Sequence, residues 1–133
     1  VLQNGEFLAS LKIPAPKKNS SSFYLRFIPR NEMDIAVVGA GASVVLDDAN
    51  TSVVSARIAL AAVAPTPLFA EEASALLAGK PVSQSSIAEA AEAAKAIVRP
   101  ISDMRGSAEQ RVHLVGVLTE RALNGAIQRV KES

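Results

Sequence analysis

Tyr24, Arg26 and Asp34 are the side chains whose types and spacing point to a binding site. Tyr24 and Arg26 stand two residues apart in an apolar stretch that predicts a strand, so both side chains are expected on one face of a sheet. Asp34 begins the next apolar run, after a connection that contains Pro29. A hydrogen-bonding aromatic ring, a guanidinium and a carboxylate are therefore expected to converge at one sheet end. The alternative is a solvated face without a ligand.

Other chemically suggestive residues have structural explanations. Gly39-Ala40-Gly41 lacks the third glycine and the following helix of a dinucleotide-binding loop, which favours small residues in a packed strand. His113 is the only histidine, and the sequence identifies no nucleophile or orienting acid for it. Asp47-Asp48 is typical of a turn rather than of a metal site. We therefore expect neither catalytic residues nor metal ligands in this chain.

Asp103 and Arg105 stand in a short connection that helix formation does not require. They are predicted to form an ion pair. That pair would either shape the loop or face a partner subunit, and the sequence favours neither role.

The composition excludes several classes of protein. The chain has 133 residues, of which 49% are hydrophobic, enough for one domain with a core of its own. Fourteen basic residues against 13 acidic ones argue against nucleic acid as a partner. The chain has no cysteine, which excludes thiolate metal sites, iron–sulfur clusters and disulfides and is compatible with the cytoplasmic location that we expect. No apolar run reaches the roughly 20 residues of a transmembrane helix.

The first half of the sequence has the pattern of an antiparallel sheet. Proline-rich or polar stretches separate apolar runs, with breaks over residues 14–22 and 29–32. Residues 47–51 are expected to join two runs as a hairpin. The predicted strands cover residues 7–13, 23–28, 35–46 and 52–63.

The second half has a helical period. Thr66-Pro67 and Gly79 are typical start and stop signals for a helix over residues 68–78. Ser86 with Glu89 and Ser107 with Gln110 predict capping boxes for two further helices, one ending before Pro100 and one over residues 108–130. Gly116 and Gly125 in the last helix suggest close packing against a neighbour. The expected apolar stripe of this helix consists of Val112, Val115, Leu118, Ala122, Ala126 and Val130.

Strands followed by helices predict an α+β fold. We expect an antiparallel sheet of three to four strands followed by three helices packed on one face. No alternation of strand and helix suggests a doubly wound nucleotide-binding fold.

Five collinear segments together resemble a known family. They are Tyr24-Leu25-Arg26-Phe27, Met33-Asp34-Ile35-Ala36-Val37-Val38, Ala56-Arg57-Ile58-Ala59-Leu60, Val63-Ala64-Pro65-Thr66-Pro67 and Pro100-Ile101-Ser102-Asp103-Met104-Arg105-Gly106-Ser107-Ala108-Glu109. They are similar to the C-terminal domain of the FAD-binding (medium) subunit of molybdenum hydroxylases, the family of carbon monoxide dehydrogenase, xanthine dehydrogenase and aldehyde oxidoreductase.

The resemblance implies that residues 1–133 form a single C-terminal domain, with the FAD-binding N-terminal domains absent from this chain. In the intact oxidoreductase, electrons would pass from molybdopterin through [2Fe-2S] clusters, both on partner subunits, to FAD and then to an acceptor. Tyr24, Arg26 and Asp34 match positions near the flavin, where the family commonly has lysine in place of Arg26. A positive charge there would stabilise an anionic reduced flavin. The chain alone is expected to be inactive.

Two other functions remain open. The domain could be an assembly module that docks the flavin subunit onto its iron–sulfur and molybdopterin partners. It could also be a stand-alone α+β binding domain that never binds flavin.

Overall fold

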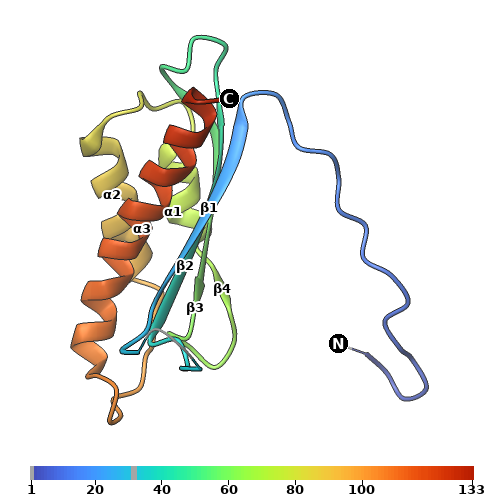
Figure 1. Cartoon of the computed structure of the whole chain (residues 1–133), viewed down its shortest axis with the longest axis vertical. Coiled ribbons are helices and arrows are strands. Elements are labelled where there is room, and N and C mark those ends of the chain that lie inside the picture. The colour runs from blue at the N-terminus through green and yellow to red at the C-terminus, as the bar shows by residue number, and fades with distance from the viewer. Residues whose placement is uncertain (1, 31–32) are drawn as a thin grey trace.

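A four-stranded antiparallel sheet and three helices form the fold of the computed structural model, which describes residues 2–30 and 33–133 (Figure 1). Strand order follows chain order, so every connection joins neighbouring strands. The strands are β1 (Ser20–Phe27), β2 (Val38–Leu46), β3 (Val53–Ala61) and β4 (Leu68–Phe69). The helices are α1 (Glu71–Leu77), α2 (Gln84–Lys95) and α3 (Ala108–Lys131). The predicted fold class is confirmed.

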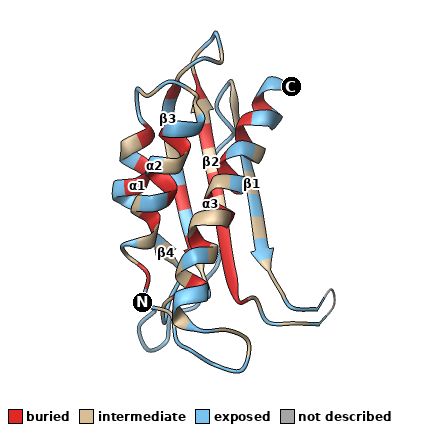
Figure 2. Cartoon of the chain, turned by 90° about the vertical axis from the view of Figure 1, so that its left-hand side faces the viewer, coloured by how far each residue is buried: buried red, intermediate tan, exposed pale blue. Residues whose placement is uncertain are grey.

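The alternation of side chains along β1 and β2 creates one buried and one open face. In β2, Val38, Ala40, Ala42, Val44 and Leu46 are buried in the core that the helices cover, and Figure 2 shows much of this strand in the colour of buried residues. In β1, Phe23, Leu25 and Phe27 pack against the same core. All three helices lie on this side of the sheet, and the other side has no helix over it (Figure 1).

The long helix α3 packs across β1 and β2, whereas α1 packs on β3. The third helix, α2, packs against both of the others. The predicted cap of α3 is confirmed, because the Ser107 hydroxyl accepts a hydrogen bond from the Gln110 backbone N–H at 3.1 Å. Five residues of the predicted stripe are buried: Val115, Leu118, Ala122, Ala126 and Val130.

The strand predicted over residues 7–13 is absent. Residues 2–18 instead form an arm that leaves the sheet on the side opposite the helices (Figure 1). Its apolar side chains are exposed, including Phe7 at 81% and Ile13 at 87%. A strand exists only when it has a partner for its backbone groups, and in this chain the arm has no sheet edge beside it.

Two predicted helix starts are also wrong. Leu68 and Phe69 pair with β3, and the first helix begins only after Ala70, without a side-chain cap. The cap of α2 is Ser83 rather than Ser86. Residues 31–32 of the predicted 29–32 connection lie outside the described residues. No helix in the described ranges is long and apolar enough to cross a bilayer.

Candidate functional site

The open face of the sheet positions Tyr24 and Arg26. In β1 these residues alternate with the three apolar side chains that pack on the helices, so both project from the opposite face. Tyr24 lies opposite Gly41 of β2, and Arg26 lies opposite Gly39. The sequence-based prediction that Tyr24 and Arg26 share a face is confirmed.

Glycines in β2 make room for the tyrosine ring. A Cβ atom added at Gly39 would lie 2.8 Å from the Tyr24 hydroxyl oxygen, and one at Gly41 would lie 3.6 Å from Tyr24 Cδ2. The ring therefore lies along the backbone of β2, where a side chain at position 39 would displace it. Tyr24 is still 58% exposed, so much of its surface is free to contact another group.

The neighbouring strands continue this face with small residues and a second cation. Ala59 and Ala61 of β3 lie opposite the two glycines of β2. The Arg57 guanidinium carbon lies 4.7 Å from the centre of the Phe69 ring in β4, a cation–π contact. Tyr24, Gly41 and Arg57 are among the residues that line a shallow groove of about 420 Å³. Sequence reasoning missed Arg57 and Phe69, because only the strand register brings them to this face.

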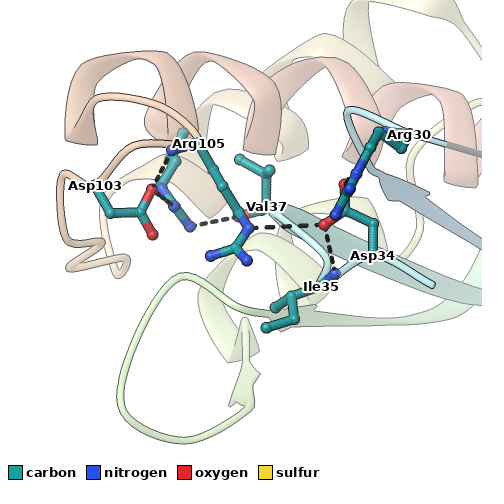
Figure 3. Close-up of polar contacts among 7 residues, drawn as sticks. Arg30, Asp34, Ile35, Val37, Asp103 and Arg105 are labelled. Carbon is teal, nitrogen blue, oxygen red and sulfur yellow. Dashed lines mark hydrogen bonds and ion pairs between the residues drawn. The ribbon is translucent and has the colours of Figure 1, made fainter.

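Asp34 lies beyond the end of β1, in the connection to β2. Its Oδ1 accepts a hydrogen bond from the Ile35 backbone N–H at 2.9 Å, and its Oδ2 accepts one from the Arg30 backbone N–H at 3.3 Å. The Nε atoms of Arg30 and Arg105 are 3.5 and 3.7 Å from its oxygens (Figure 3). The carboxylate is only 3% exposed. The structure therefore joins Asp34 to arginines; among the described hydrogen bonds and ion pairs, none links it to Tyr24 or Arg26.

These donors set the charge state of Asp34. Burial alone would raise the pKa of its carboxyl group, but hydrogen bonds from Arg30 and from the Ile35 backbone lower the pKa below its ordinary value. The carboxylate is therefore ionised at neutral pH. An ionised carboxylate held by two guanidinium groups is suited to fixing a loop.

The prediction that Asp103 and Arg105 form an ion pair is wrong, because the Asp103 carboxylate pairs with Arg111. Asp103 Oδ1 accepts hydrogen bonds from the Arg105 backbone N–H at 2.8 Å and from Arg111 Nη2 at 2.7 Å (Figure 3). The Arg105 side chain turns instead toward Asp34. The Arg105 backbone N–H, Arg111 and opposing burial together leave the pKa of Asp103 below its ordinary value. Sequence reasoning missed Arg111, whose place at the start of a helix gave no sign of burial.

The other residues singled out in the sequence lie in β2, in the β2–β3 turn and on α3. Gly39-Ala40-Gly41 lies inside β2, and Asp47 organises the β2–β3 turn through the backbone N–H groups of Thr51 and Ser52. His113 lies exposed on α3. Within residues 2–30 and 33–133, no cluster of histidine and carboxylate side chains could hold a metal ion.

Comparison with known proteins identifies the family. The family model described as the CO dehydrogenase flavoprotein C-terminal domain matches residues 23–126. The chain belongs to this family. The carbon monoxide dehydrogenase medium chain of Afipia carboxidovorans is 38% identical over 130 residues, which are 98% of this chain and 44% of that protein. The xanthine dehydrogenase FAD-binding subunit of Escherichia coli O157:H7 is 29% identical over 127 residues, 95% of this chain and 43% of that subunit.

Solved structures share the fold. A chain of the carbon monoxide dehydrogenase from Hydrogenophaga pseudoflava, solved without the Mo-pyranopterin moiety of its molybdenum cofactor, matches with a TM-score of 0.82 and 35% identity, over 88% of this chain and 40% of that one. A chain of quinoline 2-oxidoreductase from Pseudomonas putida 86 matches with a TM-score of 0.80 and 33% identity, over 89% and 40%. The chain thus spans less than half the length of the relatives that it matches.

Proposed function

We propose that this chain is the C-terminal part of the FAD-binding subunit of a molybdenum-dependent oxidoreductase, and that its open sheet face contacts the flavin. The observation that carries the proposal is the Tyr24 ring, which lies on a glycine track with Arg26 beside it. Membership of the flavoprotein C-terminal domain family supports the assignment. So does the 29% identity to the xanthine dehydrogenase FAD-binding subunit of Escherichia coli O157:H7, of which this chain covers 43%.

The residues of the open face fit a flavin. A planar aromatic ring stacks well on an exposed aromatic side chain, and Tyr24 offers one above a flat track of small residues. Bound FAD would supply the electron-carrying ring, whose electronics respond to nearby charge. The positive charge of Arg26 favours negative charge on a neighbouring ring, and a lysine at this position would keep the charge without the planar guanidinium. Asp34 would act indirectly, through the loop that it fixes.

We assign this chain no redox group of its own. It has no cysteine to ligate an iron–sulfur cluster, and in this proposal the clusters and the molybdopterin lie on partner subunits. Electrons would reach the flavin from those clusters and leave it toward an external acceptor. The chain alone would be inactive. A cytoplasmic location stays a prediction.

The decisive experiment replaces Arg26 in the complete flavin subunit within its complex. In Arg26→Met we expect a changed flavin reduction potential and slower reaction with the acceptor, because the nearby positive charge is lost. Arg26→Lys keeps the charge and should therefore recover part of the wild-type potential and part of the wild-type rate. The matched control is Arg121→Met, which removes an exposed charge from α3. An unchanged potential and unchanged acceptor kinetics in Arg26→Met would show that the open face does not contact the flavin.

An assembly role also has an observation in its favour. Apolar side chains stand exposed in two loops at one end of the molecule, and Met33 and Met104 are 100% and 94% exposed. Ile35 and Ile101, from the same two loops, line a common cavity of about 340 Å³. Exposed apolar residues grouped in this way mark docking surfaces. Under this hypothesis, Ile101→Ser with Met104→Ser would release the partner subunits while the FAD content of the flavin subunit stays constant. Loss of FAD with the complex intact would argue against it.

A further inference from the structure

The loop before α3 is a closed turn built around Asp103. Asp103 and Gly106 exchange two backbone hydrogen bonds, at 3.1 and 3.2 Å. The Asp103 carboxylate then binds the Arg105 backbone N–H inside the turn and the Arg111 guanidinium outside it, both through Oδ1. One oxygen atom therefore fixes the loop and the first turns of α3 relative to each other.

Arg105 and Arg111 both contact the segment from Asp34 to Val37, which precedes β2. Arg111 Nη1 donates a hydrogen bond to the Val37 carbonyl oxygen at 3.0 Å. Arg105 Nε lies 3.7 Å from Asp34 Oδ1 (Figure 3). Both contacts are shielded from solvent, because the side chains of Arg111 and Asp34 are 5% and 3% exposed. The segment from Asp34 to Val37 is thus held at its two ends.

This segment sets where β2 begins. The Val37 backbone N–H donates to the Phe27 carbonyl oxygen at 2.9 Å, so Val37 is bonded to β1 on one side and to Arg111 on the other. The next residue pairs with Phe27, and Gly39 then pairs with Arg26. Fixing Val37 therefore fixes the backbone from which Arg26 projects.

Stability alone does not account for a buried guanidinium here. A buried ion pair roughly breaks even against apolar residues of the same volume, because desolvation opposes the attraction. The Nε of Arg111 is also buried without a hydrogen-bond partner in the described part of the chain. What the network provides is a fixed geometry, which apolar packing specifies less sharply.

We propose that Asp103 is a positioning residue: through Arg111 and Arg105 it fixes the Asp34–Val37 segment and hence the place of Arg26 on the open face. The fixed segment is a property of this chain alone. Its effect on a flavin rests on the proposed function.

The test uses Asp103→Ala in the complete flavin subunit within its complex, followed by hydrogen–deuterium exchange. We expect peptides that contain the amides of Ile35 and Val37 to exchange about tenfold faster, since a charge-assisted hydrogen bond is lost. The centre of α3, around Leu123, should keep its protection. Asp103→Asn keeps an acceptor oxygen and should restore part of the protection. The matched control is Asp48→Ala, which removes an exposed acid of the β2–β3 turn that pairs with Lys18 and Asn19 just before β1.

A second, milder variant tests the proposal even if Asp103→Ala does not fold. Arg105→Gln keeps the backbone N–H bonded to Asp103 and the pair with Arg111, and removes only the contact with Asp34. It should speed exchange at Ile35 and leave Val37 protected. Unchanged exchange in both Asp103→Ala and Arg105→Gln would overturn the proposal, as would a uniform increase over the whole chain.

The flavin reduction potential separates this proposal from the proposed function. If both are right, Asp103→Ala shifts the potential in the direction of Arg26→Met, and Asp103→Asn shifts it less. Faster exchange at Val37 with no change of potential in either Asp103→Ala or Arg26→Met would support the positioning network and contradict flavin contact. If Arg26→Met changes the potential, while Asp103→Ala changes neither the potential nor the exchange, flavin contact is supported and the positioning network is contradicted.

Discussion

Two glycines of α3 that look alike in the sequence have different surroundings. A Cβ atom at Gly125 would lie 2.7 Å from Phe23 Cγ, and one at Gly116 would meet only the flexible Lys95 side chain, at 3.2 Å. The Phe23 ring packs against the core, and the Arg129 guanidinium carbon lies 4.4 Å from its centre, so the ring has little room to move. The close packing expected at these glycines is therefore found at Gly125, where α3 meets β1, and is looser at Gly116, where α3 meets α2.

This difference predicts opposite effects of the same substitution. Gly125→Ala should lower the free energy of unfolding by about 1–3 kcal/mol, because the added methyl group overpacks the contact with Phe23. Gly116→Ala should raise it by up to about 1 kcal/mol, because alanine favours the helix and Lys95 can move aside. Urea denaturation of both variants would measure the difference. Equal effects would show that α3 does not press on β1 at Gly125.

At the scale of elements, the capping of α2 offers a similar contrast. The Ser83 hydroxyl accepts a hydrogen bond from the Ser86 backbone N–H at 3.2 Å, whereas Glu89 of the predicted capping box pairs with Lys80. Ser83→Ala should therefore cost about 1 kcal/mol of unfolding free energy. Ser86→Ala should cost less, since it leaves the cap in place. Thermal unfolding of the two variants decides between the caps, and a larger loss in Ser86→Ala would restore the sequence-based assignment.

The elements that the sequence predicts well are those whose signals are local. The stripe of α3, its Ser107 cap and the β2–β3 turn at Asp47 each depend on residues a few positions apart. The failures depend on distant partners. Leu68 and Phe69 have a helical context but pair with β3, and residues 7–13 have a strand pattern but no partner edge.

The candidate site divides in the same way. The shared face of Tyr24 and Arg26 follows from their spacing within one strand, whereas Arg57 and Phe69 join that face only through strand pairing. The partner of Asp103 was mistaken because Arg111, eight residues away, becomes its neighbour only when α3 is in place. Local spacing thus predicted that Tyr24 and Arg26 share a face, and it missed the residues that tertiary contacts bring in.

For the molecule as a whole, the arm over residues 2–18 stands apart from the core. Its apolar residues before Pro14 are exposed, and the core of the domain begins with β1. Removing residues 1–13 should therefore shift the thermal midpoint by no more than about 2 °C, below the roughly 3–4 °C expected from a loss of 1 kcal/mol in a domain of this size. Trypsin should cleave the arm after Lys12 while the fold survives. A large fall of the midpoint on truncation would show that the arm packs on the domain.

Acid should destabilise the whole domain through its aspartates. The pKa of Asp47 is lowered in the folded state, first by the Ser52 and Thr51 backbone N–H groups that bind it, and the pKa values of Asp34, Asp48 and Asp103 are lowered as well. A carboxyl group with a lowered folded-state pKa stabilises the fold above its unfolded pKa of about 3.9 and loses that contribution as the pH falls further. The thermal midpoint should therefore be steady near neutral pH and fall below about pH 4.5.

Asp47→Asn tests the origin of that acid sensitivity. The variant should be less stable than the wild type at pH 7, and the gap should close as the pH falls, because protonation removes from the wild type the same charge that the substitution removes. Asp48→Asn should change little at either pH, since its ion pair with Lys18 is exposed on both sides and such pairs contribute little. Thermal unfolding between pH 3 and pH 7 would compare all three proteins. A gap that stays constant for Asp47→Asn would mean that its turn needs the second acceptor oxygen, which binds the Thr51 hydroxyl, and not the charge, and that the acid sensitivity arises at Asp34 and Asp103.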